Sequence, residues 1–267
     1  MKKYLSFFRM RLITGLQYRT AALAGMVTQF FWGFMEIMVF HAFYRADPSA
    51  YPMTMEATAA YVWLQQAFLA FFGAWMFEGE VFATISDGNL AYELCRPIRT
   101  YDVWFARSVA NRLSKALLRC VPILMVAVFL PRGYGLTAPV SFPAFLCFLF
   151  SLTMGLLVMV ALNVLVYGSC LFTVSGDGMR VLFASLAEFL AGQVLPLPFF
   201  PEKVQRVLEL NPFASTGNVP FRLYGGDLAG REALRAMGVQ ILWLVILVAA
   251  GRLLCARGER RAVVQGG

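Results

Sequence analysis

The stretch EGEVFATISDGNLAYELCRPIR, residues 78–99, lies between long apolar runs and decides how the rest of the chain is organised. The spacing of Val81, Phe82 and Ile85 predicts one apolar face of a helix. Asp87-Gly88 predicts the end of that helix, because glycine readily adopts the left-handed conformation of a helix cap. We expect an amphipathic segment at the cytoplasmic surface of a membrane, shaped to contact another protein. The alternative is a solvated loop between two membrane spans.

A second short helix is expected after the first, because Leu90 and Leu94 continue the apolar spacing. It should end before Arg96, since the residue that precedes a proline is biased away from helical conformation and Pro97 follows here.

The composition places these helices in a membrane protein. Of the 267 residues, 60% are hydrophobic and only 14% are charged, whereas a soluble domain is typically about 45–50% apolar and about a quarter charged. A membrane helix needs roughly 20 residues. The sequence therefore predicts an all-α membrane protein with six transmembrane helices in a single domain, residues 1–267. No room remains for a nucleotide-binding domain of ordinary size.

The pattern of apolar runs places the elements along the chain. We expect an N-terminal interfacial helix over 1–20, a cytoplasmic segment over 78–99, a turn at 175–178, and spans over 21–44, 57–77, about 100–130, 142–172, 179–193 and 236–256. Pro196, Pro198 and Pro201 interrupt the apolar pattern after the fifth span. Residues 193–213 are therefore predicted to form a broken or re-entrant outside region that contains a short amphipathic helix.

The distribution of basic residues orients this arrangement. The formal net charge is +8, and most of the 23 Lys and Arg residues fall at the N-terminus, around the second connection or in the C-terminal tail. The positive-inside rule then places both termini in the cytoplasm. Arg107, Arg112, Lys115 and Arg119 begin the third span and are expected near the cytoplasmic surface. Basic residues beside membrane spans indicate contact with anionic lipids and not with nucleic acid.

The sequence lacks the short motifs of ATP hydrolysis and other catalysis. It contains no G-x-x-x-x-G-K-[ST], G-x-S-x-G, H-E-x-x-H or C-x-x-C. We therefore expect no catalytic residues, metal site or cofactor in this chain. The one histidine, His41, is interpreted as a packing residue near the outer end of the first span.

Four polar residues fall inside predicted spans and are candidates for a transport path: Glu36, Asn163, Glu188 and Gln193. Polar groups in a membrane are costly and frequently functional. The alternative is that they join neighbouring helices by hydrogen bonds. For the two carboxyl groups a further alternative is a neutral, protonated state.

Two segments carry a resemblance to a known family. ISDGNLAYELCRPIRTYDVWFARSVANRL, residues 85–113, resembles the cytoplasmic segment between the second and third spans of ABC-2-type permeases. LAGQVLPLPFFPEKVQRVLELNPFAS, residues 190–215, is similar to their proline-interrupted fifth span and outside helical region. These permeases are the membrane subunits of ATP-binding-cassette exporters. The short loops make the chain look closer to the bacterial two-permease branch that exports drugs and viologens than to sugar-polymer exporters.

The resemblance implies a permease of the bacterial inner membrane that works as a dimer, with itself or with a similar permease. Two separate ATPase subunits would bind ATP and Mg and would dock on the segment over 78–99. The residues that match the coupling region, as contact or shape-setting positions, are Glu78, Glu80, Phe82, Ile85, Asp87, Gly88, Arg96 and Pro97.

Two other functions are compatible with the residues alone. A proton-coupled secondary transporter would use Glu36 or Glu188 as its proton site, and a membrane scaffold would transport nothing. A neighbouring reading frame that encodes an ATPase would favour the permease.

Overall fold

The computed structural model describes residues 2–17, 19–47, 52–173, 176–193 and 195–261, and these residues form helices and connecting segments without a β-strand. The helices are α1 (Lys2–Leu16), α2 (Arg19–Ala46), α3 (Met55–Ala67), α4 (Leu69–Phe72), α5 (Gly79–Ser86), α6 (Leu90–Leu94), α7 (Thr100–Phe129), α8 (Phe142–Cys170), α9 (Gly176–Leu190), η2 (Leu197–Phe199), α10 (Glu202–Leu208), α11 (Asn218–Gly225) and α12 (Gly230–Glu259). The expected all-α fold is confirmed for the described residues.

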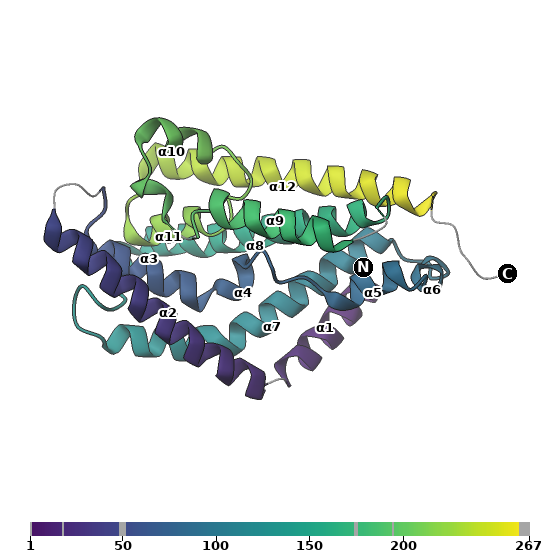
Figure 1. Ribbon diagram of the computed structural model, residues 1–267, viewed down its shortest axis with the longest axis horizontal. Coiled ribbons are helices and arrows are strands. Elements are labelled where there is room, and N and C mark those ends of the chain that lie inside the picture. The colour runs from purple at the N-terminus through teal and green to yellow at the C-terminus, as the bar shows by residue number, and fades with distance from the viewer. Residues whose placement is uncertain (1, 18, 48–51, 174–175, 194, 262–267) are drawn as a thin grey trace.

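The long helices run along one axis and form an elongated bundle (Figure 1). α8 lies at its centre and packs against α4, α7, α9, α11 and α12. Its sequence is apolar all round, which is typical of a helix that is surrounded by others. The hydroxyl of Ser141 accepts a hydrogen bond from the backbone of Ala144 at 3.2 Å and caps the start of this helix.

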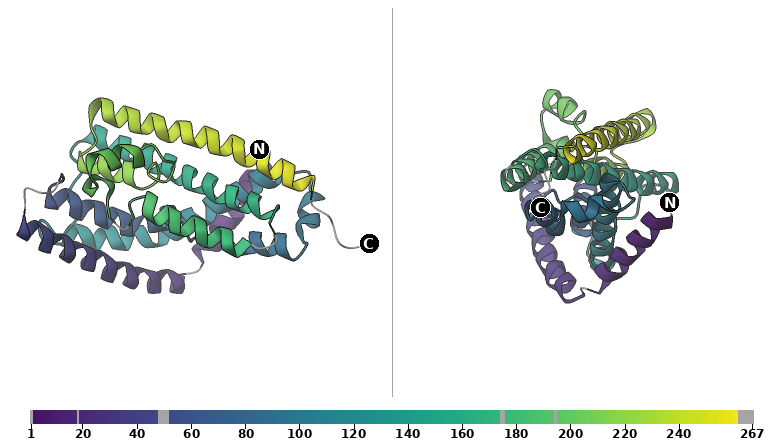
Figure 2. Two further views of the ribbon diagram at one scale, coloured as in Figure 1. Left: turned by 45° about the horizontal axis from the view of Figure 1, so that its top comes forward. Right: turned by 90° about the vertical axis from the view of Figure 1, so that its right-hand side faces the viewer.

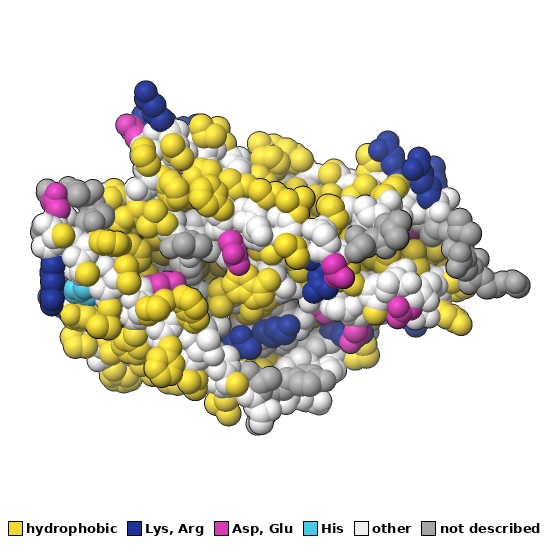
Figure 3. Space-filling view, viewed as in Figure 1, with side chains coloured by type: hydrophobic (Ala, Val, Ile, Leu, Met, Phe, Trp, Pro, Cys, Tyr) yellow, Lys and Arg dark blue, Asp and Glu magenta, His cyan; other side chains and the backbone are white. Residues whose placement is uncertain are grey.

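The two ends of the bundle differ in structure (Figure 2). α5, α6 and the C-terminal part of α12 lie at one end, which we call the α6 end, and α10 and α11 lie at the other, the α10 end. α1 packs along α7, in the half of the bundle nearer the α6 end. Lys and Arg side chains gather at the end of α12, while apolar side chains cover much of the visible face (Figure 3).

The helices predicted for 78–99 are present. α5 ends at Ser86 with Asp87 as its C-cap residue, and Gly88 follows with φ of 74°, so the predicted left-handed cap is confirmed. α6 spans the two predicted leucines, Leu90 and Leu94.

The second predicted span differs from its expected form. Instead of one helix over 57–77, α3 ends at Ala67, the single turn α4 ends at Phe72, and residues 73–78 are not helical. The expectation of a continuous helix was wrong because hydropathy does not register a break whose backbone groups find partners inside the protein.

The region after the predicted fifth span is folded back into the bundle. α9 ends at Leu190, and the proline-rich segment forms η2 and the short helix α10, as the prolines predicted. The sequence did not predict α11, which is buried along its length against α8 and α3. The turn expected at 175–178 was misplaced, since α9 already begins at Gly176; residues 174–175 lie outside the described residues.

Three helices of the described chain are long and apolar enough to cross a membrane. They are 22–46 within α2, α8 and α12. α7 is equally long but carries several charged residues, and α3, α4 and α9 are shorter. The structure therefore supports a membrane protein, while the count of six spans stays a prediction.

Candidate functional site

The polar site of this protein is built around Arg112, which is 2% exposed in the middle of the bundle. Its Nη1 donates to the carbonyl oxygens of Ala70 at 3.1 Å and Phe71 at 2.8 Å. Its Nη2 donates to those of Gly73 at 3.1 Å and Met76 at 2.9 Å. One guanidinium thus holds the end of α4 and the non-helical residues that follow it, which satisfies carbonyl groups that a broken helix leaves without partners.

The non-helical segment leads directly into α5 and is fixed again at Glu78. The backbone N–H of Glu78 donates to the hydroxyl of Tyr167 on α8 at 2.8 Å. Its carboxylate accepts a hydrogen bond from Asn111 on α7 and lies 3.7 Å from Nε of Arg107. The start of α5 is therefore attached to both central helices, α7 and α8.

A chain of charges continues from there to the N-terminal helix. Arg107 also pairs with the carboxylate of Glu80, and Nη2 of Arg11 on α1 lies 3.1 Å from the same carboxylate. The side chain of Arg107 is 5% exposed, whereas that of Glu80 is 66% exposed. We call Arg11, Glu78, Glu80 and Arg107 the charge network; it joins α1, α5 and α7 near the α6 end.

The expected position of the basic residues of the third span near the cytoplasmic surface stays a prediction, but the structure adds where two of them lie in the bundle. Arg107 and Arg112 are buried inside the protein. The sequence carried a usable signal, because a charge in an otherwise apolar helix needs internal partners. It could not name those partners: they are backbone carbonyls of α4 and the segment after it, and carboxylates of the segment after α4 and of α5.

The residues expected in the coupling segment separate into an inner and an outer group. Phe82 and Ile85 are half-buried and pack on the apolar core. The ring of Phe82 meets that of Tyr167 edge-on at 5.2 Å, and the guanidinium of Arg180 lies 4.8 Å from its centre. Both residues therefore shape α5, while Glu78 and Glu80 anchor it.

The outer group is exposed at the connection between α5 and α6. It comprises residues 86–89 and 94–97 together with Tyr92, and we call it the α5–α6 tip. The tip includes the predicted positions Asp87, Gly88, Arg96 and Pro97. Sequence reasoning missed Tyr92, whose side chain is 73% exposed although it lies in a helix. A large exposed aromatic side chain of this kind is enriched at binding interfaces.

The base of the tip is fastened to the rest of the bundle. Nε1 of Trp104 on α7 donates to the carboxylate of Glu93 on α6 at 2.9 Å. The backbone N–H of Arg99 donates to the hydroxyl of Tyr4 on α1 at 3.2 Å. The tip is thus exposed on a fixed support that is connected to α1 and α7.

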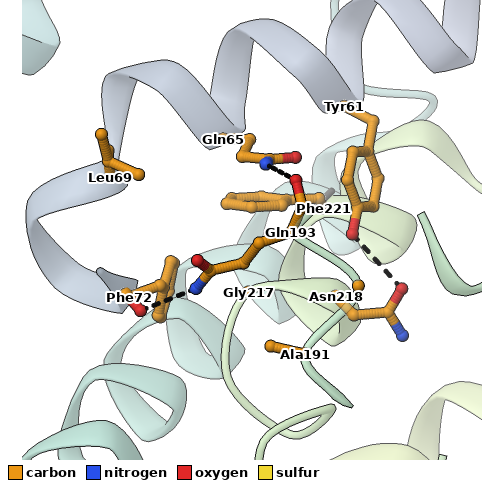
Figure 4. Close-up of a pocket in the computed structure, with 10 residues that line it drawn as sticks. Tyr61, Gln65, Leu69, Phe72, Ala191, Gln193, Gly217, Asn218 and Phe221 are labelled. Carbon is orange, nitrogen blue, oxygen red and sulfur yellow. Dashed lines mark hydrogen bonds between the residues drawn. The ribbon is translucent and has the colours of Figure 1, made fainter. Parts of the chain in front are cut away.

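Two of the four polar path candidates hold the interrupted second helix. Asn163 Nδ2 donates to the carbonyl of Met76 at 3.2 Å. Gln193 Nε2 donates to the carbonyl of Phe72 at 2.8 Å, and Gln65 Nε2 donates to the carbonyl of Gln193 at 2.6 Å (Figure 4). The pocket that Gln65, Phe72 and Gln193 help to line has a volume of about 10 Å³, which is the size of one water molecule.

The two carboxylic candidates lie on different helices. Glu36 on α2 is half-buried and accepts a hydrogen bond of 3.4 Å from Nε2 of Gln66 on α3. Glu188 is half-buried on α9, beside the exposed side chain of Phe189, and its carboxylate has no hydrogen bond or ion pair within the described part of the chain. The structure does not bring the four candidates together into one site.

His41 contributes to packing in this structure. Its Nε2 lies 3.0 Å from the carbonyl oxygen of Gly133, and its ring stacks on Tyr134 with centroids 4.0 Å apart.

A bundle with three membrane-length apolar helices, a broken helix held by a buried arginine and an exposed tip at one end defines an α-helical membrane protein. The model of the family described as ABC-2 family transporter protein matches residues 27–266, and the chain therefore belongs to that family. It is a transmembrane permease of the ABC-2 transporter class. A comparison with curated proteins finds no significant match.

Proposed function

We propose that this chain is the permease subunit of an ATP-driven exporter and that separate ATPase subunits dock on its α5–α6 tip. The observation that carries the proposal is the contrast within residues 78–99. The outer residues are exposed, with Tyr92 at 73%, whereas Val81 at the base of α5 is fully buried. Because the exposed tip rests on a base that is buried and hydrogen-bonded to the bundle, a force applied by a docked ATPase can be transmitted to the bundle.

The route of transmission follows from the contacts. A displacement of α5 acts on α1 and α7 through the charge network, because Glu80 is shared by Arg11 and Arg107. It also acts on the segment over 73–78, which Arg112 holds to α7. That segment continues into α4 and α3, so ATP binding by ATPase subunits docked on the tip would move the interrupted helix in the membrane.

The orientation follows the charge distribution of the sequence. The α6 end would face the cytoplasm of a bacterial cell, with both chain termini on that side and ATP and Mg held by the ATPase subunits. The α10 end, with α11 folded into the bundle, would face outward. Six membrane crossings agree with this arrangement if α3 with α4, α7 and α9 also cross, beside the three long apolar helices.

A second permease, identical or similar, completes the proposed transporter. Glu188 supports a partner at α9, because a carboxyl group on an apolar surface is costly against lipid. A second subunit at this face would shield it or enclose it in a path between the two permeases. Glu36, Asn163 and Gln193 would then act chiefly by holding neighbouring helices.

The experiment that tests docking is co-purification of this chain with an ABC ATPase subunit that a neighbouring reading frame encodes. Tyr92→Asp and Arg96→Glu change exposed side chains of the tip, so the fold should be retained. We expect each substitution to weaken ATPase binding by about tenfold or more, since aromatic and arginine residues commonly dominate interfaces. The matched control is Arg206→Glu, the same charge reversal on exposed α10 at the other end.

The thermal unfolding temperature separates lost docking from lost folding. The tip variants and the control should melt close to the unchanged protein. Phe82→Asp should melt at a lower temperature, because Phe82 packs on Tyr167. Full retention of the ATPase by both tip variants would refute the proposed docking surface.

A further inference from the structure

A second polar feature lies beside the charge network, in the angle between α1, the start of α2 and α7. It is a pocket of about 380 Å³, within the range of ligand pockets, about 300–1,000 Å³. Figure 3 shows Lys and Arg side chains in a hollow between these helices. Ala22 and Leu118 contribute apolar side chains to its lining.

The pocket carries an excess of positive charge. Arg11, Arg107, Lys115 and Arg119 line it, against the carboxylates of Glu78 and Glu80. These two carboxylates are already paired with the two arginines of the charge network.

Lys115 and Arg119 are the cations without such a partner. Within the described residues neither makes an ion pair or a side-chain hydrogen bond, and Nε of Arg119 is buried without an acceptor. They lie four residues apart on α7, where like charges repel each other. A buried donor without an acceptor and two adjacent cations are together favourable for an anion.

Gly25 on α2 lies against the guanidinium of Arg119, one of the residues that line the pocket. A Cβ atom at this position would lie 2.6 Å from Cζ of Arg119, closer than atoms can pack. The absence of a side chain at Gly25 therefore lets this guanidinium rest against α2.

The position of α1 indicates where the anion comes from. This helix exposes Leu5, Met10 and Ile13 together with the basic residues Lys3 and Arg9, the composition of a helix at the membrane interface. The pocket under α1 therefore lies at the level of lipid headgroups.

Apolar residues continue from the pocket toward the membrane. α2 exposes Leu23 and Val27, and α7 exposes Leu117 and Val121. Acyl chains can lie against these side chains while a headgroup occupies the pocket.

We propose that this pocket binds the phosphate group of an anionic phospholipid between Lys115 and Arg119. The bound phosphate would place one negative charge between the two unpaired cations, and the acyl chains of the lipid would lie along α2 and α7. A lipid at this position touches α1 and α7, the helices that the charge network joins to α5. The site does not depend on the docking of an ATPase.

The test is lipid binding to the purified full chain in a neutral detergent, measured by native mass spectrometry. The probes are dioleoylphosphatidylglycerol, dioleoylphosphatidylcholine and inorganic phosphate. We expect phosphatidylglycerol to bind more tightly than phosphatidylcholine, and Lys115→Gln and Arg119→Gln each to weaken its binding by about tenfold. Arg206→Gln, an exposed arginine of α10, should leave binding unchanged.

Three results would overturn the proposal. Unchanged phosphatidylglycerol binding in both pocket variants would exclude the site. Equal binding of the two lipids would exclude recognition of net negative charge. If inorganic phosphate at millimolar concentration displaces phosphatidylglycerol and raises the melting temperature as much as that lipid does, the pocket is a site for free phosphate. If Lys115→Gln or Arg119→Gln unfolds the protein, its melting curve without lipid shows this. Lipid binding to the other of these two variants then tests the site.

Discussion

Replacement of Arg112 by methionine tests the anchor of the interrupted second helix. Methionine keeps an unbranched apolar side chain in the buried space but donates no hydrogen bond. Four carbonyl groups then lose a donor, those of Ala70, Phe71, Gly73 and Met76. The substitution therefore removes the contacts and leaves most of the packing.

The loss of unfolding free energy depends on how many of these carbonyl groups keep another hydrogen-bond donor. Gly73 still accepts from the backbone of Met76, and Met76 still accepts from Asn163. Among the hydrogen bonds of the described residues, Ala70 and Phe71 have no other donor for their carbonyls. Each unpaired buried acceptor costs about 1–3 kcal/mol.

Two such acceptors lower the free energy of unfolding by about 2–6 kcal/mol. The methionine also removes the cost of burying a guanidinium, which acts in the opposite direction. We therefore expect the lower part of this range, about 2 kcal/mol, or roughly 4–8 °C in the melting temperature.

The assay is thermal unfolding in detergent, followed by tryptophan fluorescence. Arg206→Met is the matched control, because among the described residues Arg206 pairs only with the exposed Glu202 and surface pairs contribute about 0–1 kcal/mol. Arg112→Lys should fall between the two, since one ammonium group cannot reach all four carbonyls. A melting temperature of Arg112→Met within 2 °C of the control, as an order-of-magnitude limit, would refute the anchor.

Two further substitutions test local features of the fold by the same assay. Gly88→Ala should destabilise the protein by about 1 kcal/mol, because φ is 74° and the space around the new methyl group is open; equal stability would contradict the left-handed cap. Gln240→Leu should cost about 1–3 kcal/mol, because the buried Gln240 accepts from Ser151 and donates to the carbonyl of Ser215; an unchanged melting temperature would show that α8 and α12 do not need this link.

The helices around residues 78–99 could be predicted because local chemistry determines them. The end of α5 depends on a glycine with positive φ, and the short helix after it depends on apolar spacing. The shared face of Val81, Phe82 and Ile85 was also a local property. The direction in which that face points could not be predicted locally. The face packs on Tyr167 of α8, which lies more than eighty residues later in the chain.

The candidate site was predicted in part for the same reason. Asp87, Gly88, Arg96 and Pro97 were identified as part of a surface segment, and they are exposed. Tyr92 was missed because its exposure depends on how α6 lies against α7. The roles of Asn163 and Gln193 could not be foreseen, because their partners are backbone carbonyls that become available only when the second helix breaks.

The sequence by itself determined that this chain is helical, belongs in a membrane and carries an amphipathic segment between two apolar runs. Composition and periodicity suffice for this, because they set the cost of exposing each segment to water or lipid. Only the tertiary structure decided that Arg107 and Arg112 lie inside the protein and that the second helix is interrupted. A buried charge and a broken backbone are each costly alone. They become stable together because the guanidinium of Arg112 supplies the hydrogen bonds that the open carbonyls require.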